Sequence, residues 1–174
     1  MFDILMTVMN ATQQISSTRT RDAHVFVTVL RCGDERGIVG LNIIDDSHAS
    51  AGEHFIPFRV AGAKTEHGRD FVYTGIITAV DRLRKLKLNR VLLLVDDSTL
   101  VNELERKLDP PRELFLQYVI LGCKLNEFQR AKVIVTPSER LAELRAKTAN
   151  LAATIYRQRR DGVQGELLPL APAI

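Results

Sequence analysis

The sequence predicts a mixed α/β fold in which helices cover both faces of a five-stranded sheet. In the first third of the chain, runs rich in β-branched residues alternate with short connections, which predicts three sequential antiparallel strands. After about residue 70 the apolar residues recur at intervals of three and four, and two short apolar runs separate the helical segments. The 174 residues, 45% of them hydrophobic, suffice for one domain with a sizeable core.

The three early strands are expected over residues 24–31, 38–44 and 54–60. Val and Ile dominate the first two, although Gly40 interrupts the second. Pro57 lies within the third strand and has no amide hydrogen for a neighbouring strand. The third strand is therefore predicted at an edge of the sheet.

The remaining elements alternate between helices and strands. The expected order is a helix over 70–87, a strand over 90–96, a helix capped by Ser98, a helix from Pro111, a strand over 131–135 and a long helix from Pro137. The inward face of the helix from Pro111 is predicted to hold Leu114, Phe115, Tyr118, Leu121 and Leu125. Strands joined through helices predict parallel pairing in this half of the sheet.

The apolar run over 91–95, which follows Arg90, ends abruptly in Asp96, Asp97 and Ser98. This pattern is typical of a buried strand that brings carboxylates to the carboxyl edge of a sheet, where open α/β sheets bind ligands. On an extended strand Asp96 points away from Asp97, so we expect Asp96 to be solvated.

The order of elements, with this strand ending in Asp97-Ser98, resembles the ribonuclease H-like fold. The variety it resembles most accompanies reverse transcriptases and also occurs as small stand-alone bacterial and archaeal proteins. Residues 95–104 match the Ser/Thr-Asp-Ser motif and its helix, 71–76 are similar to the Ala-Glu-Tyr-x-Ala-Leu segment, and Pro137 opens a helix similar to the last one of that fold. The resemblance covers roughly 23–156. It implies a ribonuclease H-like domain over 23–160, flanked by an N-terminal extension over 1–22 and a tail over 161–174.

The resemblance implies catalysis by two divalent cations held by four acids, because both the attacking and the leaving oxygen of a phosphodiester need a metal ion. Only part of that acid set is present. The four positions fall on Thr28 or Val29, on Val72, on Asp97, and on Glu143 or Ala149. Hard cations need several carboxylates. We therefore expect an incomplete metal site and a non-catalytic pseudoenzyme with no cofactor, which binds nucleic acid or acts as a scaffold.

A nuclease with a rearranged acid set is the first alternative. It would use Asp97 and Glu143 with either Asp70 or Asp45 to hold Mg²⁺ or Mn²⁺, and it would cleave the RNA of RNA–DNA hybrids. Each acid also has a structural interpretation. Asp97 can cap the following helix, Glu143 can pair with a surface cation, and Asp70 can complement the positive end of its helix.

Two basic clusters indicate a polyanionic partner, in keeping with a net charge of +3. The residues predicted to contact phosphates of RNA, DNA or an RNA–DNA hybrid are Arg82, Lys85, Lys87, Arg90, Arg157 and Arg160. The alternative is that these cations are solvated ends of helices, where they complement the negative pole of the helix dipole. No aromatic residue interleaves with either cluster, so base stacking is not predicted.

The sequence also carries expectations about compartment and assembly. Cys32 and Cys123 lack metal-ligand spacing, and no apolar run approaches the ~18 residues of a membrane span, so we expect a cytoplasmic protein without membrane contact. The second alternative function is a protein–protein module. In that case the apolar segment 1–9 and the Leu- and Pro-rich tail would add to the sheet or groove of a homo-oligomer or another protein.

Overall fold

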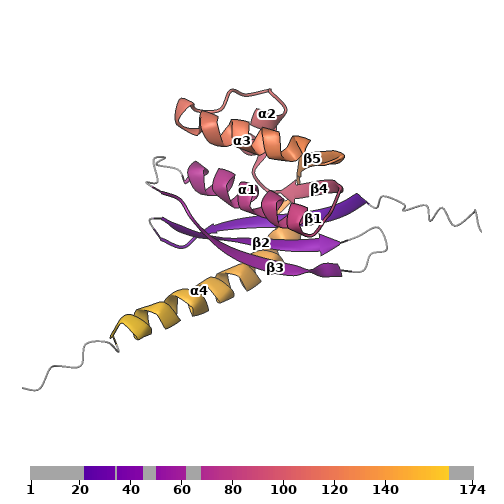
Figure 1. The fold of residues 1–174 in the computed structure, drawn as a ribbon. Helices are drawn as coiled ribbons and strands as arrows, with labels where there is room; N and C mark the ends of the chain where they lie inside the picture. Colours follow the sequence, from indigo (N-terminus) through magenta and orange to yellow (C-terminus); the bar gives the residue numbers. More distant parts are fainter. Residues whose placement is uncertain (1–21, 34, 45–49, 62–67, 165–174) are drawn as a thin grey trace, which may run out of the picture.

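A five-stranded sheet with helices on both faces forms the core of the chain, which confirms the predicted fold class (Figure 1). The computed structural model describes residues 22–33, 35–44, 50–61 and 68–164. The strands are β1 (Asp22–Arg31), β2 (Arg36–Ile44), β3 (Ser50–Arg59), β4 (Arg90–Val95) and β5 (Arg130–Val135). The α-helices are α1 (Arg69–Lys85), α2 (Ser98–Leu104), α3 (Phe115–Asn126) and α4 (Ala142–Gln164), and short 3₁₀ turns precede α3 and α4.

The order of strands across the sheet is β3-β2-β1-β4-β5. β1 pairs antiparallel with β2, and β2 with β3, as the predicted meander requires. β4 lies parallel to both β1 and β5. β3 is an edge strand, so the missing amide hydrogen of Pro57 costs no hydrogen bond inside the sheet. The parallel half brings the carboxyl ends of β1, β4 and β5 to one edge.

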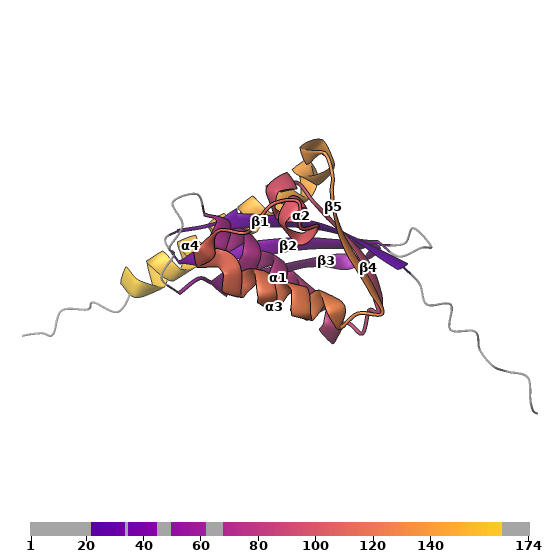
Figure 2. The same cartoon turned by 90° about the horizontal axis from the view of Figure 1, so that it is seen from above.

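The helices lie in two layers around the sheet. α1 contacts β1, β2 and β3, while α3 contacts β5 and packs beside α1. α4 crosses the opposite face and contacts β1 and β2 (Figure 2). Gly40 of β2 makes this approach possible, because a Cβ atom there would collide with the buried Thr148 hydroxyl of α4. Among the described helices, none combines the length and the apolar character that a bilayer crossing requires.

Two details of the helical half differ from the prediction. The N-cap of α2 is Asp97 rather than Ser98, because the Asp97 carboxylate accepts a hydrogen bond from Leu100 N. Phe115 was predicted to face inward, but it is 57% exposed. The inward face of α3 is centred on Leu121, which is fully buried, and Phe115 lies on a different side of the helix at ~100° per residue.

Candidate functional site

The carboxyl edge of β1 and β4 contains two of the positions that the resemblance assigns to acids. Phe26 pairs with Leu94 in the parallel register. This is the last pair of the β1/β4 register, and Thr28 and Val29 follow it on one strand as Asp96 and Asp97 follow it on the other. Thr28 is 2% exposed and faces α4, whereas Val29 faces Gly75 of α1.

The first turns of α1 and α4 complete the same edge. The Arg31 guanidinium at the end of β1 lies 5.0 Å from the centre of the Phe71 ring, so the adjacent Val72 also lies near this edge. Arg145, in the first turns of α4, forms an ion pair with Asp96 at the end of β4. The structure therefore brings together the backbone positions expected to carry a metal site. At the β1 and α1 positions, the side chains have no carboxylate.

Asp97 occupies the acid position at the end of the strand, and its carboxylate caps the helix that follows. Its carboxylate accepts a hydrogen bond of 2.8 Å from Leu100 N, and its backbone is extended with φ −97° and ψ 95°, as in an N-cap. Asp96 was expected to be solvated. It is exposed, and it is also held in an ion pair by Arg145. Both acids at this edge therefore already have partners.

Glu143, the candidate for the last acid, belongs to a surface ion pair. Its side chain is 83% exposed, and Lys147 Nζ lies 2.8 Å from Glu143 Oε1 at i,i+4 spacing. The hydrogen bond and the charge of Lys147 lower the pKa of Glu143. Lys147 also pairs with Glu53 of β3 at 2.8 Å. The other candidate, Ala149, offers no donor atom.

Asp70 is 3% exposed in the first turn of α1, where its Oδ1 accepts from Phe71 N at 3.1 Å. Within the described residues, no three His, Cys, Asp or Glu side chains gather as a metal site would require. Asp70, Asp97 and Glu143 are thus not brought together, and Asp45 lies outside the described residues. The described donor atoms at this edge do not fit a pair of hard divalent cations, which need several carboxylates around them.

A buried polar network beside this edge was missed by the sequence analysis. Glu103 of α2 is 2% exposed, and its Oε2 accepts hydrogen bonds of 2.6 Å from both Arg69 and Tyr73 of α1. Burial is the main cause that raises the pKa of Tyr73, and the hydrogen bond to Glu103 raises it further. The available signal was the position of Glu103 three residues after Leu100, on the inward face of α2. The network ties α1 to α2, because two donors from α1 share the Oε2 atom of Glu103.

The predicted phosphate contacts lie on two separate surfaces. Lys85 and Lys87 are exposed at the carboxyl end of α1. Lys85 and Arg82 line a groove of about 440 Å³ between α1 and β3, where Arg82 Nη2 lies 3.3 Å from His54 Nδ1. Burial, followed by the charge of Arg82, lowers the pKa of His54. Arg90 begins β4 beyond this end of α1.

The second predicted cluster is on the last turns of α4. These turns lie at the opposite end of the molecule from the carboxyl end of α1 (Figures 1 and 2). The side chains of Arg157 and Arg160 are outside the described part of the chain. The backbone positions of these residues therefore place the two clusters at opposite ends of the molecule.

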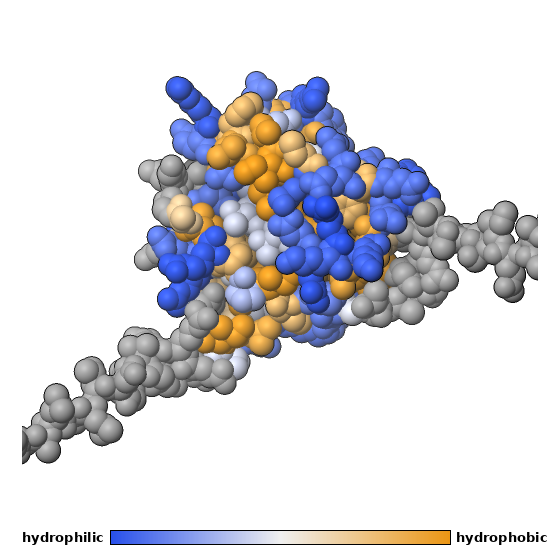
Figure 3. Space-filling model, in the orientation of Figure 1, coloured by the Kyte–Doolittle hydropathy of each residue, from blue (hydrophilic) through white to orange (hydrophobic). Residues whose placement is uncertain are grey.

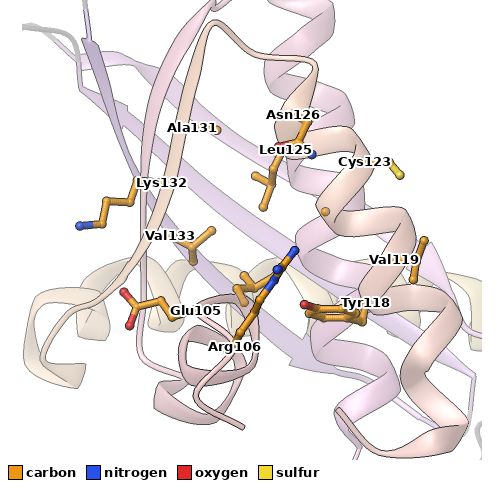
Figure 4. A pocket seen from close by; sticks show the side chains of 12 residues that line it. Glu105, Arg106, Tyr118, Val119, Cys123, Leu125, Asn126, Ala131, Lys132 and Val133 are labelled. Carbon is orange, nitrogen blue, oxygen red and sulfur yellow. The ribbon is translucent and has the colours of Figure 1, made fainter. Parts of the chain in front are cut away.

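A second groove, of about 430 Å³, runs between the end of α2, the helix α3 and the edge strand β5. Leu125 and Val133 point into it from α3 and β5, and Arg106 extends across it from the end of α2 (Figure 4). Arg106 has a left-handed backbone with φ 59°, which ends α2 sharply. This groove is walled mainly by apolar side chains and is not part of the acidic edge.

Known proteins resemble this chain in structure and not in sequence. No protein-family model and no curated protein sequence matches the chain. A ribonuclease H1 from the halophilic archaeon Halobacterium salinarum superposes with a TM-score of 0.61 at 16% identity, over 72% of this chain and 92% of that one. The N-terminal ribonuclease H domain of a Mycobacterium tuberculosis protein gives 0.60 at 17% identity, over 78% and 99%.

A third solved structure, LC11 ribonuclease H1 in complex with an RNA/DNA hybrid, gives a TM-score of 0.58 at 14% identity, over 71% of this chain and 91% of that one. At such low identities the likeness establishes the fold and leaves the chemistry to the residues of this chain. The element order, the sheet topology and these superpositions agree: this chain has the ribonuclease H-like fold.

Proposed function

We propose that this chain is a ribonuclease H-like domain that binds nucleic acid without hydrolysing it. One observation carries the proposal, namely that each position of the expected acid set is either empty or already engaged. Thr28, Val29 and Val72 have no carboxylate, Asp97 caps α2, and Glu143 is solvated beside Lys147. A phosphodiester hydrolysed by two cations needs bridging carboxylates between them.

The charges around the edge argue in the same direction. Arg145 neutralises Asp96, while Arg69 and Tyr73 hold the nearby Glu103. A divalent cation at this edge would have to displace these donors and would then lie close to the two guanidinium groups. These two guanidinium groups therefore weaken the attraction of this edge for a divalent cation.

Support for nucleic acid as the ligand comes from the exposed cations at the carboxyl end of α1 and from the net charge of +3. Lys85 and Lys87 are exposed, and Lys85 borders a groove that is open to solvent beside β3. Exposed cations close together at a helix end can neutralise phosphates of a nucleic-acid backbone. The solved complex of LC11 ribonuclease H1 with an RNA/DNA hybrid makes such a hybrid the first ligand to test.

The test measures binding and cleavage on one labelled RNA–DNA hybrid. Fluorescence anisotropy is expected to show binding that weakens as salt rises, and gel electrophoresis is expected to show an intact hybrid in Mg²⁺ or Mn²⁺. Lys85→Ala together with Lys87→Ala removes about two phosphate contacts. The salt slope should then fall by about 1.8, and affinity should drop ~30-fold at ~0.15 M salt.

The matched control is Lys132→Ala, an exposed lysine on β5 at the opposite edge of the sheet from β3. It should leave the affinity for the hybrid nearly unchanged. Cleavage of the hybrid that disappears in Asp97→Asn would overturn the non-catalytic half of the proposal and favour the nuclease alternative. Equal losses in the control and the α1 variant would overturn the assignment of the surface.

A further inference from the structure

Helix α3 is apolar on two opposite faces. Its inward side chains, together with the preceding turn, are Leu114, Tyr118, Leu121 and Leu125. On the outward side lie Phe115, Leu116, Val119 and Ile120, which are 57%, 67%, 40% and 37% exposed. A surface helix normally presents polar residues to water, and a helix that is hydrophobic all round is normally covered on all sides.

The outward residues form one surface, named here the α3 patch, which consists of Phe115, Leu116, Val119, Ile120 and Cys123. Hydrophobic side chains gather over α3 at the top of the molecule in Figure 3. We estimate on the order of 400 Å² of contiguous apolar area, which reaches the size of the largest patches on typical monomers and marks interaction surfaces.

We propose that a second copy of this chain covers the α3 patch, with the two α3 helices packed antiparallel around a twofold axis. The axis would pass between Val119 and Ile120, so that Leu116 of one copy lies opposite Cys123 of the other. The same geometry places Arg112 opposite Glu127 of the second copy. Both residues are exposed at the two ends of the patch, and Glu127 also forms an ion pair with Arg84 of its own chain.

The arrangement of charges is what selects a second copy in this orientation. An antiparallel pair brings the positive Arg112 to the negative Glu127 at both ends, and it opposes the dipoles of the two helices. A parallel pair would instead place each Arg112 beside its symmetry copy. The antiparallel orientation is therefore the one that places Arg112 beside an opposite charge at both ends.

The area agrees with a reversible dimer. Two α3 patches together supply ~800 Å² of apolar surface, and a polar rim brings the total toward the lower limit of ~1,200 Å² for specific interfaces. Gly122 has open space where a Cβ would be, so the backbone of α3 is accessible beside the groove of Figure 4. The expected dissociation constant is roughly micromolar.

Sedimentation velocity of the full chain over about 1 to 100 µM tests the dimer, because a dimer of this kind dissociates on dilution. The wild type should shift from monomer to dimer across this range, while Leu116→Asp should stay monomeric throughout. Ala153→Asp adds the same charge to an exposed position of α4, on the other face of the sheet, and should dimerise as the wild type does. Circular dichroism should show all three folded.

Oxidative cross-linking tests the orientation in a background with Cys32→Ser. Leu116→Cys with Cys123 retained should form a disulfide-linked dimer, because these two positions face each other. Leu116→Cys with Cys123→Ser should not, since the two Leu116 positions lie ~10 Å apart along the antiparallel helices. A monomer at every concentration, a dimer that survives Leu116→Asp, or cross-linking through residue 116 alone would each overturn the proposal.

Discussion

The role of Asp97 can be decided by comparing its replacement by Ala and by Asn. The carboxylate makes a 2.8 Å hydrogen bond to Leu100 N and satisfies one of the free amides at the start of α2. Asp97→Ala removes that acceptor, which should lower the free energy of unfolding by about 1 kcal/mol, within 0.5–2 kcal/mol for helix caps. Asparagine caps a helix almost as well, so Asp97→Asn should lose only a few tenths of a kcal/mol.

Thermal unfolding followed by circular dichroism measures both variants. A loss of ~1 kcal/mol lowers the melting temperature by roughly 2–4 °C in a chain of this size. Ser98→Ala is the matched control, because Ser98 is exposed and is not the cap. It should fall within about 0.5 kcal/mol of the wild type.

Magnesium provides the refuting result. A cap has no affinity for the ion, so ~10 mM Mg²⁺ should change the melting temperatures of wild type and Asp97→Asn equally. A metal site with a dissociation constant of ~0.1 mM would instead stabilise the wild type alone by about 2.7 kcal/mol. That difference, or equal losses for Asn and Ala, would refute the interpretation of Asp97 as a cap.

The remaining predictions concern the packing around the same edge. Glu103→Ala leaves Arg69 without its buried partner and should lower the free energy of unfolding in urea by roughly 2–4 kcal/mol. This is somewhat less than the loss for a fully buried ion pair, because the Arg69 side chain is 19% exposed. The pKa of Tyr73 is raised in the folded chain, so its contribution to stability is complete below the unfolded pKa of ~10 and is lost as the pH rises above that value. Tyr73→Phe should make the decline of stability at alkaline pH less steep in a series of unfolding measurements at different pH. Glu143→Ala should change stability by less than about 0.5 kcal/mol. Gly40→Ala should destabilise the chain by more than ~1 kcal/mol through its collision with Thr148, and Thr148→Ala in the same chain should recover part of that loss, as a double-mutant cycle would show.

Much of the fold could be predicted because residue preferences within short segments agree with the strands that those segments form. The Val-rich first strand, Pro57 on the edge strand and the apolar run over 91–95 each carry their own signal of pairing or burial. The outward position of Phe115 could not be predicted in this way. Since α3 is apolar all round, hydrophobic spacing does not tell which face meets the core.

The site was harder to predict because it depends on contacts between distant segments. The pairing of Asp96 with Arg145 spans 49 positions, and the network of Glu103 with Arg69 spans 34. No spacing rule connects residues at such separations. The elements that the resemblance assigns to one site are neighbours in the fold, since β4, which precedes Asp97, lies beside β1, and the first turns of α1 and α4 are close to it. The proposed absence of hydrolysis, the phosphate-binding lysines and the domain limits stay predictions.

The most direct test of the central claim is a count of bound manganese. Electron paramagnetic resonance reports free Mn²⁺, so a titration of the metal-free chain gives the number of ions that it holds. With its acids absent or engaged at this edge, the chain should leave Mn²⁺ free at ~0.1 mM, and Asp97→Asn should give the same curve. About two ions bound per chain and released by Asp97→Asn would contradict the claim, because such a pair is what two-metal hydrolysis requires.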